Sequence, residues 1–190
     1  MLLFSFLFLS CGTNKKDPPT TQVDNPPQNA GEYAKVTQSF DTFVKKKEVW
    51  ATGGSVTVNW NIDVNAMKQS GLTDKTIQDV RELYSELTYN SATYGEDGNS
   101  YGKVKYVVKA VKWITQNWNK ILNRMPPKVK SIVVKWIRID RLVSLLDHYM
   151  KFSDKIETVI TNAVNDILPW WMRWATPGIV WVITTAIPVL

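Results

Sequence analysis

The sequence predicts an α+β fold that is mostly helical, with a small N-terminal β-hairpin region followed by a bundle of four to five helices. Strict alternation of apolar and polar residues occurs in residues 55–64, and such alternation is typical of a half-buried strand. After Gly71, apolar residues recur instead every three or four positions, which is the spacing of a helix that buries one face. Residues 174–190 contain no charged residue, so the bundle is expected to end in a very apolar segment.

The hairpin is expected within residues 32–66. Its second strand has one apolar face, made of Val56, Val58, Trp60, Ile62 and Val64. Gly53 and Gly54 precede this strand and suit a tight turn back to the segment KKEVWAT. We therefore expect an antiparallel pair that packs its apolar face on the rest of the protein.

Helical spacing predicts the remaining elements. A helix capped by Thr73 or Asp74 is expected to end before the loop YNSATYGEDGNSYG, which begins at residue 89. Later helices are expected at residues 103–124, 128–150 and 153–168. Pro126 and Pro127 separate the first two of these helices, and Pro169 ends the third.

Composition excludes several kinds of functional site. The 190 residues include one cysteine, Cys11, and one histidine, His148. An intramolecular disulfide and a zinc site of the usual type are therefore excluded. No motif for nucleotide binding, hydrolysis or metal binding occurs, so we expect no enzyme activity, no cofactor and no metal.

The chain opens with an apolar run, residues 2–9, followed by Ser10, Cys11 and Gly12. This arrangement resembles the signal peptide of a bacterial lipoprotein, in which the cysteine receives lipid and becomes the new N-terminus. It departs from that pattern because Phe8 stands where leucine is usual and no basic residue precedes the run. The resemblance implies an exported protein anchored in the cell envelope through a lipidated, palmitate-bearing Cys11. The alternatives are an ordinary secretory signal and an N-terminal membrane helix, for which the run is short.

Four segments follow from this interpretation: a signal peptide at 1–10, a lipid-anchored flexible linker at 11–31, a hairpin, helix and loop region at 32–102, and a basic, Trp-rich helical region at 103–190. The linker is rich in Thr, Asn, Gln and Pro and cannot fill a core.

Positive charge is concentrated in one part of the chain. Residues 103–141 contain eleven Lys and Arg residues and a single acid, Asp140, so this stretch carries +10 while the whole chain carries +6. Lys105, Lys109 and Lys112 follow helical spacing and share a face, with no acid placed to relieve their repulsion. We expect an external polyanion to supply the missing negative charge. An anionic lipid membrane, an anionic envelope glycan and a solvated face without a partner are the alternatives, whereas nucleic acid is unlikely to meet an exported protein.

Four of the fourteen residues in PWWMRWATPGIVWV, residues 169–182, are tryptophan. A helix over residues 174–190 would be about 25 Å long, against a hydrocarbon core of about 30 Å. The segment could therefore span a bilayer, lie in its interface, or form a core element, and we expect it to have affinity for a bilayer.

The basic residues and the indoles together define a candidate surface for membrane or anion binding. Its members are Lys105, Lys109, Lys112, Lys120, Lys128, Lys130, Lys135, Arg138, Trp113, Trp118, Trp136, Trp170, Trp171, Arg173, Trp174 and Trp181. In composition and in its proline-broken helical layout, the region resembles the cationic Trp-rich bacteriocins that fold as saposin-like bundles. That resemblance implies that the lysines bind headgroups and that the indoles then enter the interface, with permeabilisation of the membrane as a further step. The alternative is a non-catalytic envelope protein that binds a partner protein or an anionic glycan.

Overall fold

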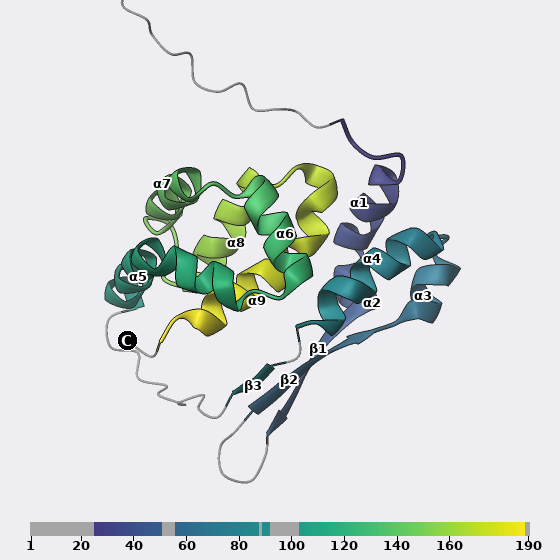
Figure 1. Ribbon diagram of the computed structural model, residues 1–190, viewed down its shortest axis with the longest axis horizontal. Helices are drawn as coiled ribbons and strands as arrows, with labels where there is room; N and C mark the ends of the chain where they lie inside the picture. Colours follow the sequence, from purple (N-terminus) through teal and green to yellow (C-terminus); the bar gives the residue numbers. More distant parts are fainter. Residues whose placement is uncertain (1–24, 51–55, 88, 92–102, 189–190) are drawn as a thin grey trace, which may run out of the picture.

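The computed structural model describes residues 25–50, 56–87, 89–91 and 103–188. In the N-terminal half, the helices and strands are α1 (Ala30–Gln38), α2 (Phe40–Phe43), β1 (Val44–Trp50), β2 (Val56–Ile62), α3 (Val64–Gln69), α4 (Asp74–Ser85) and β3 (Tyr89–Ser91). In the C-terminal half they are α5 (Lys103–Arg124), α6 (Pro127–Trp136), α7 (Ile139–Tyr149), α8 (Ile156–Ile167), the 3-10 helix η1 (Trp170–Ala175) and α9 (Thr176–Ala186). The predicted class, α+β and mostly helical, is confirmed (Figure 1).

The sheet is antiparallel with the strand order β1-β2-β3. β1 pairs with β2 in a register that sets Val44 opposite Ile62, as the predicted hairpin requires. The apolar face of β2 packs on the core, with Val58 only 3% exposed and Trp60 lying against the buried cluster. Gly53 and Gly54, the predicted turn, lie outside the described residues.

Three short helices and one strand were not predicted. α1 begins at Ala30, so the last residues of the expected linker 11–31 belong to a helix. α2 and α3 flank the hairpin within the region where the sequence indicated only strands. β3 occupies the start of the expected loop, because residues 89–91 pair with the second edge of β2.

α4 forms as predicted. The side chain of Thr73 accepts a hydrogen bond from the backbone N–H of Thr76 and so caps the first turn. The predicted apolar stripe of this helix is buried throughout its length, at Ile77, Val80, Leu83, Tyr84 and Leu87.

The predicted helix 128–150 is wrong, because it is two helices. α6 ends at Trp136 and α7 begins at Ile139, and the residues between them, Ile137 and Arg138, are extended. Ile137 is 5% exposed, so the break turns this side chain into the core. The change of direction lets α6 pack on α9 while α7 packs on α8.

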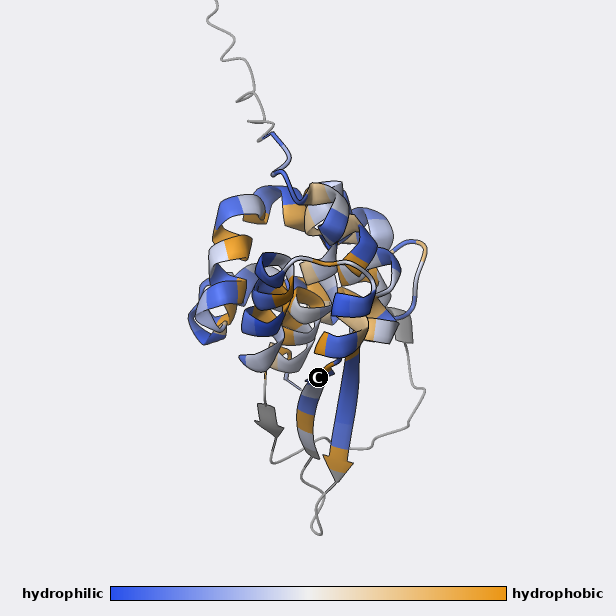
Figure 2. Cartoon of the chain, turned by 90° about the vertical axis from the view of Figure 1, so that its right-hand side faces the viewer, coloured by the Kyte–Doolittle hydropathy of each residue, from blue (hydrophilic) through white to orange (hydrophobic). Residues whose placement is uncertain are grey.

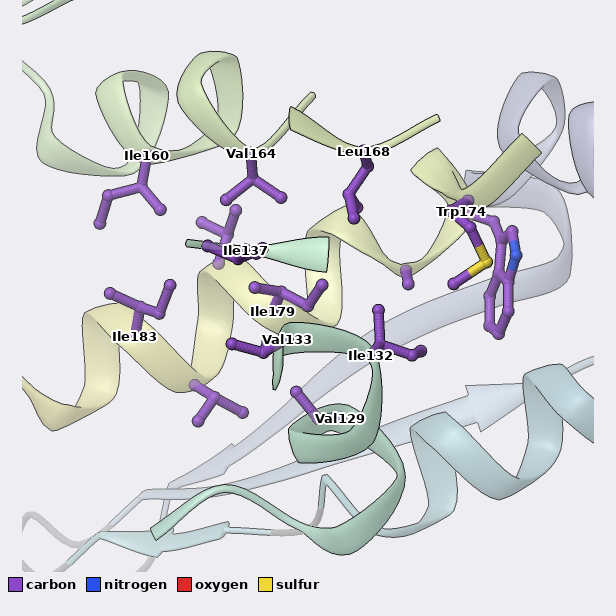
Figure 3. Packing of buried hydrophobic residues seen from close by; sticks show 14 of the residues in the cluster. Val129, Ile132, Val133, Ile137, Ile160, Val164, Leu168, Trp174, Ile179 and Ile183 are labelled. Atoms are coloured by element: carbon purple, nitrogen blue, oxygen red, sulfur yellow. The ribbon is translucent and has the colours of Figure 1, made fainter. Parts of the chain in front are cut away.

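The apolar C-terminal segment is the centre of the helical bundle. Figure 3 shows α9 between α6 and α8, with Ile179 and Ile183 facing residues of both neighbours. Pro177 lies in the first turn of α9, where a missing backbone N–H costs little, so it does not interrupt the helix. Of the three alternatives predicted for this segment, the structure agrees with the third, in which the segment forms part of the core. Within the described residues, no helix is both long enough and apolar enough to cross a membrane.

The two halves of the chain share one core. Tyr33 of α1 stacks on Trp174 of η1 with ring centroids 5.5 Å apart, and the Tyr84 hydroxyl donates to the Trp174 carbonyl at 2.7 Å. Trp60 of β2 meets Trp181 of α9 edge to face. A single cluster of buried side chains therefore crosses the predicted boundary between residues 102 and 103. Figure 2 shows that hydrophilic positions lie on the outer turns of the helices, on the side away from this core.

Candidate anion- and membrane-binding surface

The outer face of α5 carries lysines that no acid of the described residues balances. The helix buries Val107, Ile114 and Ile121 on one side, and its opposite side exposes Lys109, Lys112 and Lys120, which we call the lysine face. α5 contains no acidic residue. Within the part of the chain that the structure describes, none of the three lysines forms an ion pair. The lysine face therefore presents uncompensated positive charge to solvent.

Two features limit the extent of this face. Lys105 lies in the first turn of α5, but its side chain is outside the described part of the structure. The helix also kinks at Asn117, whose backbone leaves the helical region at φ −117° and ψ 18°. The Asn117 side chain donates to the carbonyl of Trp113 at 3.0 Å, across the turn before the kink.

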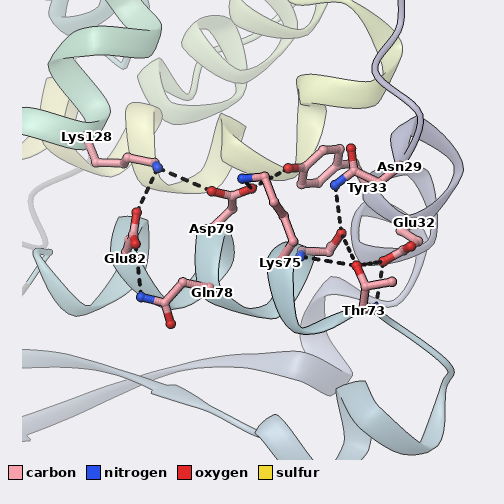
Figure 4. A network of polar contacts seen from close by, with 10 residues as sticks. Asn29, Glu32, Tyr33, Thr73, Lys75, Gln78, Asp79, Glu82 and Lys128 are labelled. Atoms are coloured by element: carbon pink, nitrogen blue, oxygen red, sulfur yellow. Dashed lines mark hydrogen bonds and ion pairs between the residues drawn. The ribbon is translucent and has the colours of Figure 1, made fainter.

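Lys128 does not belong to the candidate surface, although the sequence placed it there. Its ammonium nitrogen lies 2.8 Å from a Glu82 oxygen and 3.3 Å from an Asp79 oxygen, both on α4 (Figure 4). The hydrogen bond to Glu82 raises the pKa of Lys128, with burial acting in the opposite direction and Asp79 adding to the rise. Its charge is therefore used to hold α6 against α4.

Lys128 is one end of a polar network that also reaches α1. Asp79 accepts hydrogen bonds from the Tyr33 hydroxyl at 2.5 Å and from Lys75 at 3.1 Å (Figure 4). Burial alone would raise the pKa of the Asp79 carboxyl, but these hydrogen bonds and the Lys128 charge hold it below its ordinary value. Burial and the bond to Asp79 raise the pKa of Tyr33 to about 12. The network joins α1, α4 and α6 and is a structural element rather than a binding site.

A second group of predicted residues meets where α6 ends against η1. The Trp136 ring lies edge to face on Trp171 at 5.7 Å, and the Lys135 ammonium stands 4.8 Å from the centre of the Trp136 ring. Trp170 is 51% exposed, and Arg173 is exposed with its Nε donating to the Asn165 carbonyl at 3.2 Å. We call these five residues, Lys135, Trp136, Trp170, Trp171 and Arg173, the aromatic corner.

Three of the indoles expected at a lipid interface are core residues. Trp118 is 8% exposed, Trp171 is 9% exposed and Trp174 is 3% exposed. Trp113 and Trp181 are half-buried against the same cluster. For Trp118, Trp171 and Trp174 the expectation of availability to a bilayer is wrong for the folded protein, because these three rings supply large apolar area that fills its interior. Trp170 is exposed.

The remaining predicted cations are only loosely held. Lys130 donates to the side-chain oxygen of Asn123 at 3.4 Å, and Arg138 pairs with Asp140, two residues later, at 3.1 Å. Both members of that pair are more than 60% exposed, so solvent screens the interaction. These side chains can exchange their present contacts for an external anion at little cost.

Phe152 was not among the predicted site residues. Of the large apolar side chains that the structure describes, it is the most exposed, at 73%. It stands in the α7–α8 connection, where its backbone N–H donates to the Tyr149 carbonyl and its ring lies 5.2 Å from that of His148. Exposed Lys151 and Lys155 flank it. An isolated phenylalanine between lysines, outside both helical stripes, is the signal that could have indicated it.

Cys11, the expected lipidation site, lies outside the described residues. Among the residues that are described, no group of three or more His, Cys, Asp or Glu side chains is placed to hold a metal ion. Comparison of the chain with protein-family models, with curated proteins and with solved structures found no match in any of the three.

Proposed function

We propose that the protein is an exported envelope lipoprotein whose folded helical bundle docks on an anionic membrane through the lysine face. The observation that carries this proposal is the exposure of Lys109, Lys112 and Lys120 on a helix without acids, with no ion pair to any described carboxylate. A face selected only for solubility would intersperse both signs of charge.

Electrostatics sets the expected strength of docking. Each lysine held near an anionic bilayer contributes about 1 kcal/mol, so three lysines contribute about 3 kcal/mol, or roughly a hundredfold in affinity. The attraction acts over a Debye length of about 8 Å at physiological salt, so only charges on the docking side count. Binding is therefore expected to weaken as salt is raised.

Two exposed aromatic side chains, which lie on elements other than α5, can add apolar contact. Trp170 in the aromatic corner is amphipathic and suits the headgroup region, where its ring is flanked by Arg173. Phe152 is flanked by Lys151 and Lys155 on a hydrogen-bonded turn. Both rings can enter the interface without any helix leaving the bundle.

A lipid on Cys11 would make this weak docking sufficient to keep the folded protein on the membrane. The tether of residues 11–29 confines the body near the bilayer and raises its effective concentration to about the millimolar range. Partitioning of the chain into a detergent phase, compared with that of a Cys11→Ser variant, tests this anchor. Loss of detergent partitioning is expected for the variant.

Charge reversal on α5 tests the docking face. In a sedimentation assay with vesicles of phosphatidylglycerol, Lys109→Glu with Lys112→Glu is expected to weaken binding by at least about thirtyfold, because about 1 kcal/mol is lost per lysine. The matched control is Lys45→Glu with Lys47→Glu on β1, which changes net charge equally at exposed positions. The control is expected to stay within about threefold of the unchanged protein. Equal losses in the two variants would contradict a specific docking face.

Burial of the C-terminal segment favours one alternative, a non-catalytic surface protein that binds an anionic glycan or a partner protein. With Trp171 and Trp174 in the core, the folded surface offers charge more than apolar insertion. Absence of binding to both phosphatidylglycerol and phosphatidylcholine vesicles, together with retention on a polyphosphate matrix, would support this alternative. Leakage of trapped dye from anionic vesicles would instead support a permeabilising role, for which the buried indoles must leave the core.

A further inference from the structure

A pocket of about 490 Å³ opens between the end of α4, the α5–α6 turn and the C-terminal half of α9. Its volume lies in the range of small-molecule sites, about 300–1,000 Å³. Apolar side chains form much of its wall, including Met125, Trp181, Val182 and Ala186. The two charged side chains that line it, Glu86 and Arg124, are exposed and therefore stand at its mouth.

The hydroxyl of Thr185 does not make the wall polar. Its oxygen donates to the Trp181 carbonyl at 2.8 Å, one turn back in α9, so the hydroxyl is satisfied within its own helix. Trp181 is itself held in place by Trp60, whose ring meets it at 89°. The apolar wall is therefore built on packed elements rather than on a loop.

The two charges at the mouth differ in how they are used. A Glu86 oxygen accepts the backbone N–H of Lys128 at 3.1 Å, and so caps the first turn of α6. Arg124 forms no hydrogen bond or ion pair with any group in the described ranges. Its guanidinium presents a planar fork of N–H donors, which matches the two oxygens of a carboxylate or the oxygens of a phosphate.

We propose that this pocket binds an anionic amphiphile, a single alkyl chain that lies on the Trp181 wall with its carboxylate or phosphate head on Arg124. The complementarity is of two kinds: an apolar wall for the chain, and one uncommitted cation at the mouth for the head. A cationic head would meet Arg124 unfavourably, while Glu86 is already engaged in capping α6. The site goes beyond the proposed docking function and does not use the lysine face.

Calorimetric titration of the full chain carrying Cys11→Ser, so that no attached lipid competes, tests the site. Decanoate below its micellar concentration is expected to bind one to one, decan-1-ol at least tenfold more weakly, and acetate not detectably. Decyl phosphate is expected to bind like decanoate, which shows that the charge of the head rather than the carboxylate group is recognised. No binding of decanoate, or equal binding of decanoate and decan-1-ol, would overturn the proposal.

Two variants separate the head site from the wall. Arg124→Gln is expected to weaken decanoate binding about tenfold and to leave decan-1-ol unchanged, and it alters only an exposed side chain. Ala186→Trp fills the pocket and is expected to abolish binding of both ligands. Lys120→Gln is the matched control, because it removes a cation from the same helix that does not line the pocket. Binding of decanoate to Arg124→Gln and Ala186→Trp at unchanged affinity would overturn the proposal.

Binding of decanoate to the pocket is independent of membrane docking. The pair Lys109→Glu and Lys112→Glu is expected to bind decanoate as the unchanged chain does, even though it loses vesicle binding. A chain that binds decanoate but not vesicles would refute the proposed function alone, and the reverse result would refute the pocket alone.

Discussion

Gly178 sets how closely α9 approaches α4. A Cβ at this position would lie 2.9 Å from a terminal carbon of Leu83 and 2.9 Å from one of Leu87. Both leucines are completely buried, so their terminal carbons would have to shift within the core. The Tyr84 hydroxyl lies at the same contact, where burial raises the pKa of Tyr84 well above its ordinary value.

Gly178→Ala is therefore expected to destabilise the protein. Overpacking costs about 1–3 kcal/mol, and the gain in helix propensity of about 1 kcal/mol offsets only part of it. Gly31→Ala in α1 is the matched control, because nothing lies within 4 Å of the added Cβ, and it is expected to stabilise by up to about 1 kcal/mol. Urea unfolding measures both changes. Stabilisation by both substitutions would contradict the close approach of α9 to α4.

At the level of single residues, sequence alone could not assign the indoles to core or interface. Trp118 follows helical spacing with the buried residues Ile114 and Ile121, and periodicity could have placed it in the core. Trp174 carries no such information, because its ring packs on Tyr33, which lies far earlier in the chain. The same amphipathic side chain suits a protein interior and a membrane surface, so the distant partner decides.

The contact between α4 and α6 depends on ionised carboxylates. Asp79 has a folded-state pKa below its ordinary value of 3.8, so its charge stabilises the fold fully above that pH. The contribution is lost as the pH falls through the lowered folded-state pKa and the carboxyl is protonated. Glu82 acts in the same direction, since the hydrogen bond from Lys128 lowers its pKa.

Asp79→Asn is expected to flatten the pH dependence of stability. The free energy of unfolding of the unchanged protein should fall between about pH 5 and pH 2 more steeply than that of the variant, because the variant has no carboxyl to protonate at this contact. Urea unfolding at a series of pH values measures the slopes. Asp41→Asn, an exposed change in α2, is the control and should keep the slope of the unchanged protein. Identical slopes for all three proteins would show that the Asp79 network does not stabilise the fold.

At the level of elements, apolar spacing was sufficient to predict a helix where the helix is long and has one solvent-exposed face. α4 and α5 were predicted with nearly their observed bounds, and so was β2 from its alternation. The break between α6 and α7 contains neither proline nor glycine, so the local sequence does not indicate that a helix ends there. The break forms because Ile137 gains burial by turning inward. α1, α2 and α3 are too short for periodicity to identify.

The whole molecule is expected to bind a membrane without opening. The candidate surface was predicted as one patch of lysines and indoles, but folding divides it, because most of the rings are needed inside while the lysine face remains outside. That division depends on how many large apolar side chains the core of the complete fold needs. No local sequence pattern gives this number. The lysine positions could be predicted because charged side chains stay at the surface whatever the fold.

Trp170→Phe tests whether the fold stays closed on the membrane. If the bundle remains packed, Trp170, the most exposed indole among the side chains that the structure describes, is expected to be open to quenching by brominated anionic lipid, and the variant is expected to lose much of that quenching. Lipid quenching of Trp fluorescence measures this, with Trp113→Phe, a half-buried ring, as the control. Quenching that is undiminished in Trp170→Phe but reduced in Trp174→Phe would show that a buried ring reaches the lipid and that the helices separate.

The stacking of Tyr33 on Trp174 also fixes when the protein can fold. The apolar faces of α1 and α4 are not fully covered until η1 and α9 have left the ribosome, because these two elements form part of the opposing wall. The nascent chain therefore cannot complete this part of its core until residues 170–186 have been synthesised. If the protein is exported as proposed, this delay is an advantage, because the chain stays competent for threading through a translocation channel until those residues arrive.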